Sequence, residues 1–221
     1  MAAQPGLVPA VEERLLNSSM DSLKTAIIIF VRDPVAGKVK TRLAKTIGNE
    51  KALKVYKLLL AHTRQITAPL NCDKFIFYAE EIIQQDRWSE GSYLKKSQSG
   101  EDLGERMLNA FTELFIQGYK QVLIIGSDCY ELTTDIINDA FNLLEQNDAV
   151  IGPAHDGGYY LLGMRKLIPE IFRNKSWSTD HLRQETVSEL DEIGFSYDLL
   201  PVLSDVDDEE DLEKSGINLL L

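Results

Sequence analysis

Short apolar runs, which predict buried strands because a buried helix would be longer, alternate along this chain with amphipathic segments. The strand-like runs lie at residues 25–31, 75–79, 93–97, 121–125, 149–152, 158–164 and 195–200. The segments with apolar residues at helical spacing lie at 41–47, 50–67, 103–117, 134–144, 182–193 and 208–214. This alternation predicts crossover connections, and hence an α/β fold with a mostly parallel mixed sheet flanked by helices.

Chain length and apolar content indicate one folded domain. With 221 residues, of which 44% are hydrophobic, the chain can bury one sizeable core, and we expect it to span residues 23–221. Residues 1–22 mix Pro, Gly and Ala with a short amphipathic piece and predict a loosely attached extension. Asn49 is expected to cap the helix that starts at residue 50.

Charge and cysteine usage narrow the function classes. A net charge of −12 argues against nucleic-acid binding and against adhesion to anionic membranes. No run approaches the ~18–20 apolar residues of a transmembrane helix, and no signal-peptide pattern is visible. Cys72 and Cys129 form no CxxC pair, and the three histidines show no zinc spacing. We expect a cytoplasmic protein, whose oligomeric state, a homodimer included, stays open.

A basic turn follows the first strand and points to phosphate binding. The strand ends at Asp33-Pro34, and a glycine-bearing loop then leads into a helix whose N-terminus favours anions. The turn matches neither the P-loop pattern nor the dinucleotide fingerprint, and a solvated basic loop is the alternative reading. The candidate phosphate-binding residues are Arg32, Gly37, Lys38, Lys40 and Arg42.

Carboxylates at other strand ends suggest a metal site. Asp128 follows the strand at 121–125, where ligands of open α/β sheets bind, although it could simply cap a helix. Asp205 and Asp207 alternate as on an extended segment, so they face one side. Together the three would suit Mg²⁺ or Mn²⁺, because uncompensated carboxylates in a crevice repel one another. For the following acids, 208–210, ordinary helix N-terminal electrostatics is the preferred interpretation.

A glycine pair starts the strand at 158–164. Gly157 and Gly158 would let a ligand approach the backbone closely, or they would simply let the strand bend. Asp156 before them could accept a hydroxyl proton or bind a sugar hydroxyl. We expect Asp156, Gly157, Gly158 and Tyr159 to contact an acceptor or sugar, although an aromatic residue at a sheet edge more often only packs.

These segments together resemble a known family. The motifs lie at residues 30–43 (FVRDPVAGKVKTRL), 98–106 (QSGEDLGER), 126–132 (GSDCYEL), 152–163 (GPAHDGGYYLLG), 177–179 (WST) and 205–212 (DVDDEEDL). They resemble a bacterial family of glycosyltransferase-A-like proteins, of the type associated with radical-SAM and selenium-related proteins. More distantly, the chain is similar to the phospholactate and molybdenum-cofactor guanylyltransferases.

The resemblance implies a nucleotide-diphospho-sugar transferase fold with a divalent metal. In the guanylyltransferase relatives the residues resembling Asp128, Asp205 and Asp207 bind metal, and the segment resembling 40–43 faces the nucleotide phosphates. One departure is Tyr130, which stands where the family usually has proline.

The resulting hypothesis is a metal-dependent transferase with a nucleotide-sugar donor and a small-molecule acceptor, in which Lys40 and Asp156 are catalytic. The alternatives are a nucleotidyltransferase that releases pyrophosphate from an NTP, and a non-catalytic nucleotide-binding module.

Overall fold

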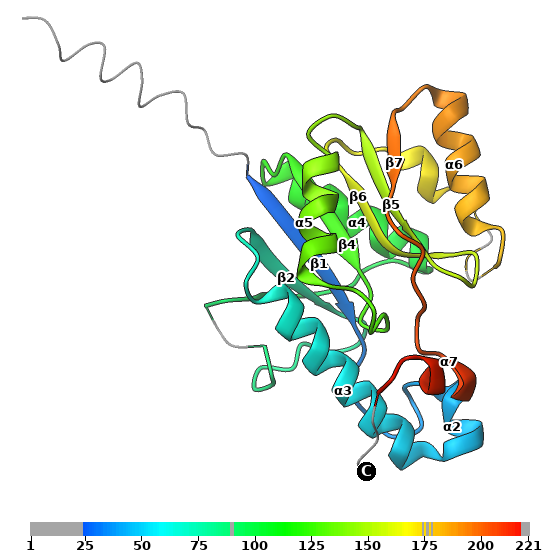
Figure 1. Ribbon diagram of the computed structural model, residues 1–221. Helices are drawn as coiled ribbons and strands as arrows, with labels where there is room; N and C mark the ends of the chain where they lie inside the picture. Colours follow the sequence, from blue (N-terminus) through cyan, green and yellow to red (C-terminus); the bar gives the residue numbers. More distant parts are fainter. Residues whose placement is uncertain (1–23, 89–90, 174, 176, 178, 218–221) are drawn as a thin grey trace, which may run out of the picture.

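A mixed sheet forms the centre of the structure, and Figure 1 shows helices on both of its faces. The computed structural model describes residues 24–88, 91–173, 175, 177 and 179–217. Within these residues the strands are β1 (Thr25–Val31), β2 (Asp73–Tyr78), β3 (Leu94–Ser97), β4 (Gln121–Ile125), β5 (Ala149–Pro153), β6 (Tyr159–Met164) and β7 (Tyr197–Leu199). They pair in the order β3-β2-β1-β4-β6-β5-β7.

The helices connect the strands much as the periodicity predicts. They are α2 (Thr41–Ile47), α3 (Asn49–Thr67), α4 (Leu103–Ile116), α5 (Thr134–Leu143), α6 (Leu182–Ile193), α7 (Glu209–Lys214) and a short 3₁₀ helix, η1 (Pro169–Phe172). The sequence pattern did not predict η1. Asn49 is not a cap, because it lies inside α3 and Gly48 is the flanking residue, with no side-chain capping bond.

Most strand pairs are parallel, and β6 is the exception. β1 pairs in parallel with β2 and β4, and β2 pairs in parallel with β3. β6 runs antiparallel between β4 and β5, whereas β5 and β7 are parallel. The structure therefore confirms the predicted fold class, an α/β fold around a mostly parallel mixed sheet.

The alternation of side chains along β1 divides the core into two layers. Ile27, Ile29 and Val31 point to one face and pack in the cluster that contains the buried side chains of α3 and α5. Ala26 and Ile28 point to the opposite face and pack with α4, η1 and α6. Because both faces of the strand are covered, β1 reads as a continuous apolar run, as expected for a buried parallel strand.

A third apolar cluster lies beyond the strand ends. Leu43 of α2, Leu59 of α3 and Leu212 of α7 pack there with Val206 of the segment before α7. Figure 1 shows α2, α7 and one end of α3 grouped together below the sheet. This cluster holds the basic turn and the C-terminal acidic segment close to each other, although Lys40 and Asp207 are 167 residues apart in the sequence.

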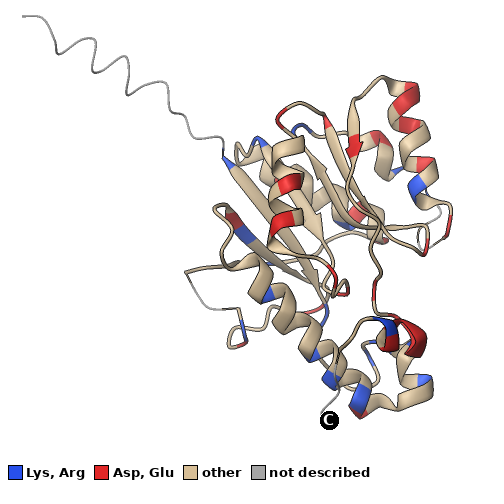
Figure 2. Cartoon of the chain, in the orientation of Figure 1, with Lys and Arg blue, Asp and Glu red and all other residues tan. Residues whose placement is uncertain are grey.

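Charges are distributed unevenly over the described surface. Figure 2 shows Asp and Glu along α5, α6 and α7, and Lys and Arg along α2 and α3. No helix in the described part of the chain has the length and apolar content to cross a membrane. The predicted extension at 1–22 lies outside the described residues.

The buried carboxylate of Asp148, just before β5, connects the end of β6 with the start of the edge strand β7. The Asp148 carboxylate accepts hydrogen bonds from the Ser196 N–H and hydroxyl, both at 3.1 Å, just before β7. It also pairs with Arg165 Nε at 3.1 Å and Lys166 Nζ at 3.2 Å, just after β6. Burial by itself raises the pKa of Asp148, but these hydrogen bonds outweigh it and lower the pKa to about 2.

We predict that Asp148→Asn destabilises the fold by about 1–3 kcal/mol near neutral pH, because hydrogen bonds to a charged group are lost. A carboxyl whose pKa is lower when folded contributes stability above its unfolded pKa and loses it as pH falls through the folded pKa. Urea unfolding of the wild type should therefore show a loss of stability from about pH 4 to pH 2 that the variant lacks. Asp198→Asn, at an exposed position of β7, is the control, and equal acid sensitivity of the wild type and Asp148→Asn would contradict the role of Asp148.

Candidate active site

The candidate site lies at the carboxyl edge of the parallel strands. β1 and β4 pair in parallel from Thr25↔Gln121 to Ile29↔Ile125, so the residues that follow both strands meet at one edge. The C-terminal segment returns to this edge, where Asp205 forms an antiparallel bridge with Cys129. The Val206 N–H donates to the Asp128 carbonyl at 3.0 Å, which sets the two acidic segments side by side.

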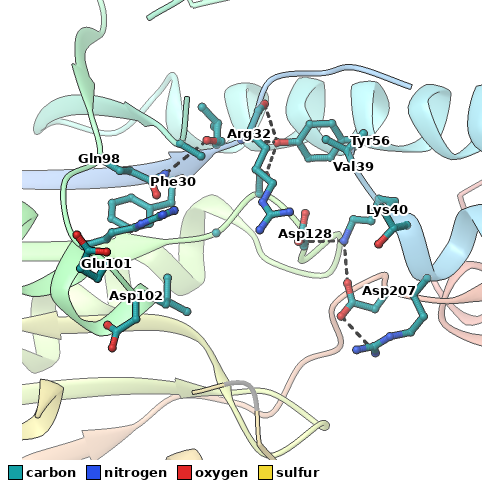
Figure 3. Close-up of a pocket in the computed structure, with 18 residues that line it drawn as sticks. Phe30, Arg32, Val39, Lys40, Tyr56, Gln98, Glu101, Asp102, Asp128 and Asp207 are labelled. Carbon is teal, nitrogen blue, oxygen red and sulfur yellow. Dashed lines mark hydrogen bonds and ion pairs between the residues drawn. The ribbon is translucent and has the colours of Figure 1, made fainter. Parts of the chain in front are cut away.

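Lys40 joins the predicted phosphate-binding turn to the predicted metal ligands. Its ammonium lies 2.9 Å from Asp128 Oδ2 and 2.9 Å from Asp207 Oδ1, and its side chain is 4% exposed. Figure 3 shows the ammonium between the two carboxylates. Burial by itself disfavours the charged amine, but the two carboxylates raise the pKa of Lys40 above its ordinary value. Lys40 is therefore a buried cation.

The backbone of Lys40 adopts a costly conformation. With φ 47° and ψ 45° at the start of α2, it alone among the described non-glycine residues has a positive φ. Such left-handed conformations cost of order 1 kcal/mol or more and persist where the surroundings compensate. The strained backbone directs the Lys40 ammonium toward Asp128 and Asp207. The two ion pairs that result offset the cost of the strain.

Asp205 is a partly buried carboxylate on the segment that lies beside Asp128. Burial, reinforced by the Asp128 charge, raises the pKa of Asp205 to about 7. Asp205 and Asp207 both line the smaller of the two clefts described below. Asp207 Oδ2 also lies 3.7 Å from Arg42 Nη1. Lys40 and Arg42 therefore both compensate the charge of Asp207, and Lys40 also compensates that of Asp128.

The donor atoms at this edge suit a divalent cation by type. Carboxylate oxygens are the ligands that Mg²⁺ and Mn²⁺ prefer, and Asp128 Oδ1 is buried without a hydrogen-bond partner. In the described part of the chain, however, no three His, Cys, Asp or Glu side chains converge in an arrangement that could hold a metal ion. The Lys40 ammonium occupies the position between Asp128 and Asp207, so it supplies the positive charge that a metal ion would otherwise supply.

The acids after Asp207 have a different role. Asp208 Oδ1 accepts from the Asp211 N–H at 3.1 Å, and Asp211 Oδ2 accepts in return from the Asp208 N–H at 3.1 Å. This reciprocal capping box stabilises the start of α7. It agrees with the interpretation of these residues as ordinary helix N-terminal acids.

The larger of the two clefts, about 660 Å³, opens above the ends of β1 and β4. Arg32 projects into it from the end of β1, and Figure 3 shows Arg32 and Lys40 on either side of Asp128. The backbone of Arg32 is fixed by Tyr56, whose hydroxyl accepts from the Arg32 N–H at 2.8 Å and donates to the Arg32 carbonyl at 3.2 Å. Four basic and four acidic residues line this cleft: Arg32, Lys40, Arg42, Arg106, Glu101, Asp102, Asp128 and Asp207.

One wall of this cleft comes from a segment that the sequence reading did not place in the site. Residues 98–106 follow β3 and enter α4, and they contribute Gln98 and Arg106 to the lining. Gln98 Nε2 donates to the Phe77 carbonyl at 2.9 Å, and Arg106 Nε donates to the Gly100 carbonyl at 3.1 Å. The sequence feature that could have indicated this wall is a strand followed by a glycine, Gly100, and then a helix. The basic turn has the same order of elements.

The smaller cleft, about 300 Å³, shares the walls Phe30, Leu103 and Gly126 with the larger one. Asp156, Gly158 and Tyr159 line it, as do Asp205 and Asp207. The structure therefore gathers most of the predicted acceptor residues and two of the predicted metal ligands around one cavity.

The first residue of the glycine pair has a structural reason that involves no ligand. Gly157 has φ +88°, and a Cβ there would lie 2.0 Å from the Asp180 carbonyl oxygen. The Gly158 N–H donates to Asp156 Oδ1 at 2.9 Å and closes the turn. The bend therefore accounts for Gly157, and the contact of either glycine with an acceptor stays a prediction.

Gly37 and Lys38 lie outside the linings of both clefts. Gly37 has φ +79° in the turn before α2, and the Lys38 N–H donates to the Val35 carbonyl at 3.0 Å. Their predicted role in phosphate binding also stays a prediction.

Comparisons with known proteins place this geometry in context. A family model described as "Uncharacterized protein conserved in bacteria (DUF2064)" matches residues 62–179, more than half of the chain. A crystal structure described as a "putative nucleotide-diphospho-sugar transferase" from Desulfovibrio desulfuricans G20 is 36% identical, with a TM-score of 0.80. That match covers 85% of this chain and 84% of the other. No curated protein matches the chain.

More distant solved structures share only the fold. The 4-diphosphocytidyl-2C-methyl-D-erythritol synthase from Anaerococcus prevotii DSM 20548 is 13% identical with a TM-score of 0.55, and the match covers 90% of this chain and 97% of that one. Rv0371c from Mycobacterium tuberculosis H37Rv is 8% identical with a TM-score of 0.51, covering 89% and 98%. The fold predicted from the motifs is thereby confirmed.

We predict that Tyr56→Phe destabilises the fold by about 0.5–1.5 kcal/mol, because the part-buried hydrogen bonds between its hydroxyl and the Arg32 backbone are lost. Tyr197→Phe is the matched control, since its hydroxyl lies 3.4 Å from Asp191 at an exposed site and its loss should be nearly neutral. Urea unfolding of both variants measures the difference. Equal stability of the two variants would mean that Tyr56 does not fix the end of β1.

Proposed function

This chain belongs to the bacterial family described as "Uncharacterized protein conserved in bacteria (DUF2064)", and from that premise we propose that it is a transferase that uses an activated nucleotide donor. The observation that carries the proposal is the cluster of Lys40, Asp128, Asp205 and Asp207 at the carboxyl edge of the sheet. In open α/β sheets this edge is where nucleotides bind. The cluster faces a cleft of about 660 Å³, within the usual range for small-molecule sites.

The donor that we favour is a nucleotide diphospho-sugar. The 36% identical protein from Desulfovibrio desulfuricans carries that description, and it matches over most of both chains. The acceptor oxygen would attack the anomeric carbon, the bond from that carbon to the phosphate oxygen would break, and the nucleoside diphosphate would leave. The acceptor proton would pass to Asp156, which lines the smaller cleft.

Basic side chains would bind the diphosphate. Arg32, Lys40 and Arg42 line the larger cleft, and Arg106 adds a fourth cation from α4. Four acidic residues balance them in the described lining, so phosphate binding gains if a divalent cation neutralises some of these acids. Asp128, Asp205 and Asp207, which by themselves do not converge on one metal position, would hold Mg²⁺ or Mn²⁺ together with the donor phosphates. The bound ion would stabilise the charge that develops on the leaving phosphate.

A second candidate is nucleotidyl transfer from an NTP. There the acceptor attacks the α-phosphorus, the bond to the bridging oxygen breaks, and pyrophosphate leaves. The observation in its favour is the set of four basic residues in the described lining of the larger cleft, whose charge suits a triphosphate.

We predict a metal-dependent rise of the thermal midpoint with one nucleotide-sugar in a panel that also contains NTPs. A ligand at about 100-fold over its Kd stabilises the native state by about 2.7 kcal/mol. Asp128→Asn should remove the metal-dependent part, whereas Asp139→Asn, at an exposed position of α5, should keep it. Pyrophosphate release from an NTP would replace the favoured donor with the second candidate, and no shift with any nucleotide would overturn both.

We predict that Lys40→Met raises the affinity for Mn²⁺ in the absence of nucleotide by about tenfold, because each factor of ten requires only about 1.4 kcal/mol. Removal of the ammonium leaves Asp128 and Asp207 without their counter-ion, so a metal ion meets less competition. The same variant should bind nucleotide more weakly. Isothermal titration with MnCl₂ alone measures the first effect.

The control for Lys40→Met is Lys45→Met, which removes an exposed charge from the same helix. Its Mn²⁺ affinity should equal that of the wild type. Equal Mn²⁺ affinity of Lys40→Met and the wild type would show that the ammonium does not compete with the metal ion.

A further inference from the structure

The smaller cleft has an apolar floor. Met107 of α4, Ile124 of β4, Leu161 of β6 and Leu182 of α6 line it, and each is at most 6% exposed. Phe30 and Leu103 continue this surface toward the larger cleft. A cavity with such a lining gains little from polar ligands, because their hydroxyl groups would lose water without gaining partners.

The indole ring of Trp177 forms one wall of the cleft, and Gly104 leaves the space that the ring occupies. A Cβ at Gly104 in α4 would lie 2.2 Å from Trp177 Cζ2, so the ring packs directly on the helix backbone. A glycine inside a helix costs about 1 kcal/mol relative to alanine. Glycine at position 104 therefore lowers the stability of α4, but it leaves the space that the Trp177 ring needs to line this cleft.

The charged residues in the lining lie close to one another and form one group, which we call the polar end of the cleft. Asp156, Asp205 and Asp207 line that end with Arg42, next to Lys40. Of the other described residues in the lining, Tyr159 has a buried hydroxyl without a hydrogen-bond partner. A single unpaired hydroxyl can satisfy one ligand oxygen, whereas a hexose brings several.

We propose that the smaller cleft binds the acceptor of the transfer, and that this acceptor is an alcohol with an apolar, aromatic or branched aliphatic body rather than a sugar. The body lies on the apolar floor against Trp177, and the hydroxyl lies at the polar end near Asp156. The inference rests on the proposed function, because it names the acceptor class of the same site. It holds for either donor, since both transfers need an acceptor oxygen at this position.

The probe for this inference is 4-phenyl-1-butanol, and glucose is its polar counterpart. The chain has two tryptophans, and Trp88 packs in the core cluster on the opposite face of the sheet, so Trp177 reports the cleft. We expect a saturable change of tryptophan fluorescence with the alcohol and none with glucose. Trp177→Phe should abolish the change.

A matched pair of variants on α4 separates cleft binding from adsorption to the surface. Leu103→Gln places an amide in the cleft at a residue that is 42% exposed, so the helix should still fold. It should weaken alcohol binding about tenfold, and circular dichroism checks the fold. Ile116→Gln, at the other end of the helix and 81% exposed, should bind the alcohol as the wild type does.

The outcomes distinguish this inference from the proposed function. Saturation with glucose, or no saturation with the alcohol while nucleotides still raise the thermal midpoint, overturns the inference and leaves the proposed function in place. Equal affinity of Leu103→Gln and the wild type also overturns it. Saturation with the alcohol that Leu103→Gln weakens, without any nucleotide effect on the midpoint, supports the apolar cleft and overturns the transferase proposal.

Discussion

The repulsion among carboxylates at one edge of the sheet is the constraint on which this site depends. Asp128, Asp205 and Asp207 come from two segments that the backbone holds together through the Cys129–Asp205 bridge. Such a group requires a cation, and Lys40 supplies it with two ion pairs of 2.9 Å. The strained φ of Lys40 shows that the turn accepts a local cost to place the charge there.

The two-layered core makes this edge possible. Alternate residues of β1 pack against α3 and α5 on one face and against α4, η1 and α6 on the other, so the strand ends are rigidly placed. The third cluster, which includes Leu43 of α2 and Leu212 of α7, then holds these two helices beyond the strand ends. The polar site is thus supported on apolar contacts, and those of the third cluster lie outside the linings of both clefts.

Local patterns predicted most of the elements, because their causes are local. β1 and β4 were predicted at their observed bounds, since an apolar run of five to seven residues buries both faces of a strand. Asp102 and Thr133 cap α4 and α5, and each side chain accepts a hydrogen bond from a backbone N–H of the first helical turn. The predicted cap at Asn49 was wrong, because Gly48 reverses the chain between two consecutive helices and leaves Asn49 inside α3.

From its sequence alone, this protein's fold class, its basic turn and the acidic residues of the edge were readable, because they follow from hydrophobic periodicity, turn chemistry and motif order. Only the tertiary structure decided that β6 runs antiparallel, that Gly157 makes room for the Asp180 backbone, and that Lys40 pairs with Asp128 and Asp207. These features depend on contacts between residues far apart in the chain. Periodicity and spacing describe neighbours along the chain, so they do not specify which distant charge or carbonyl will fill a given space.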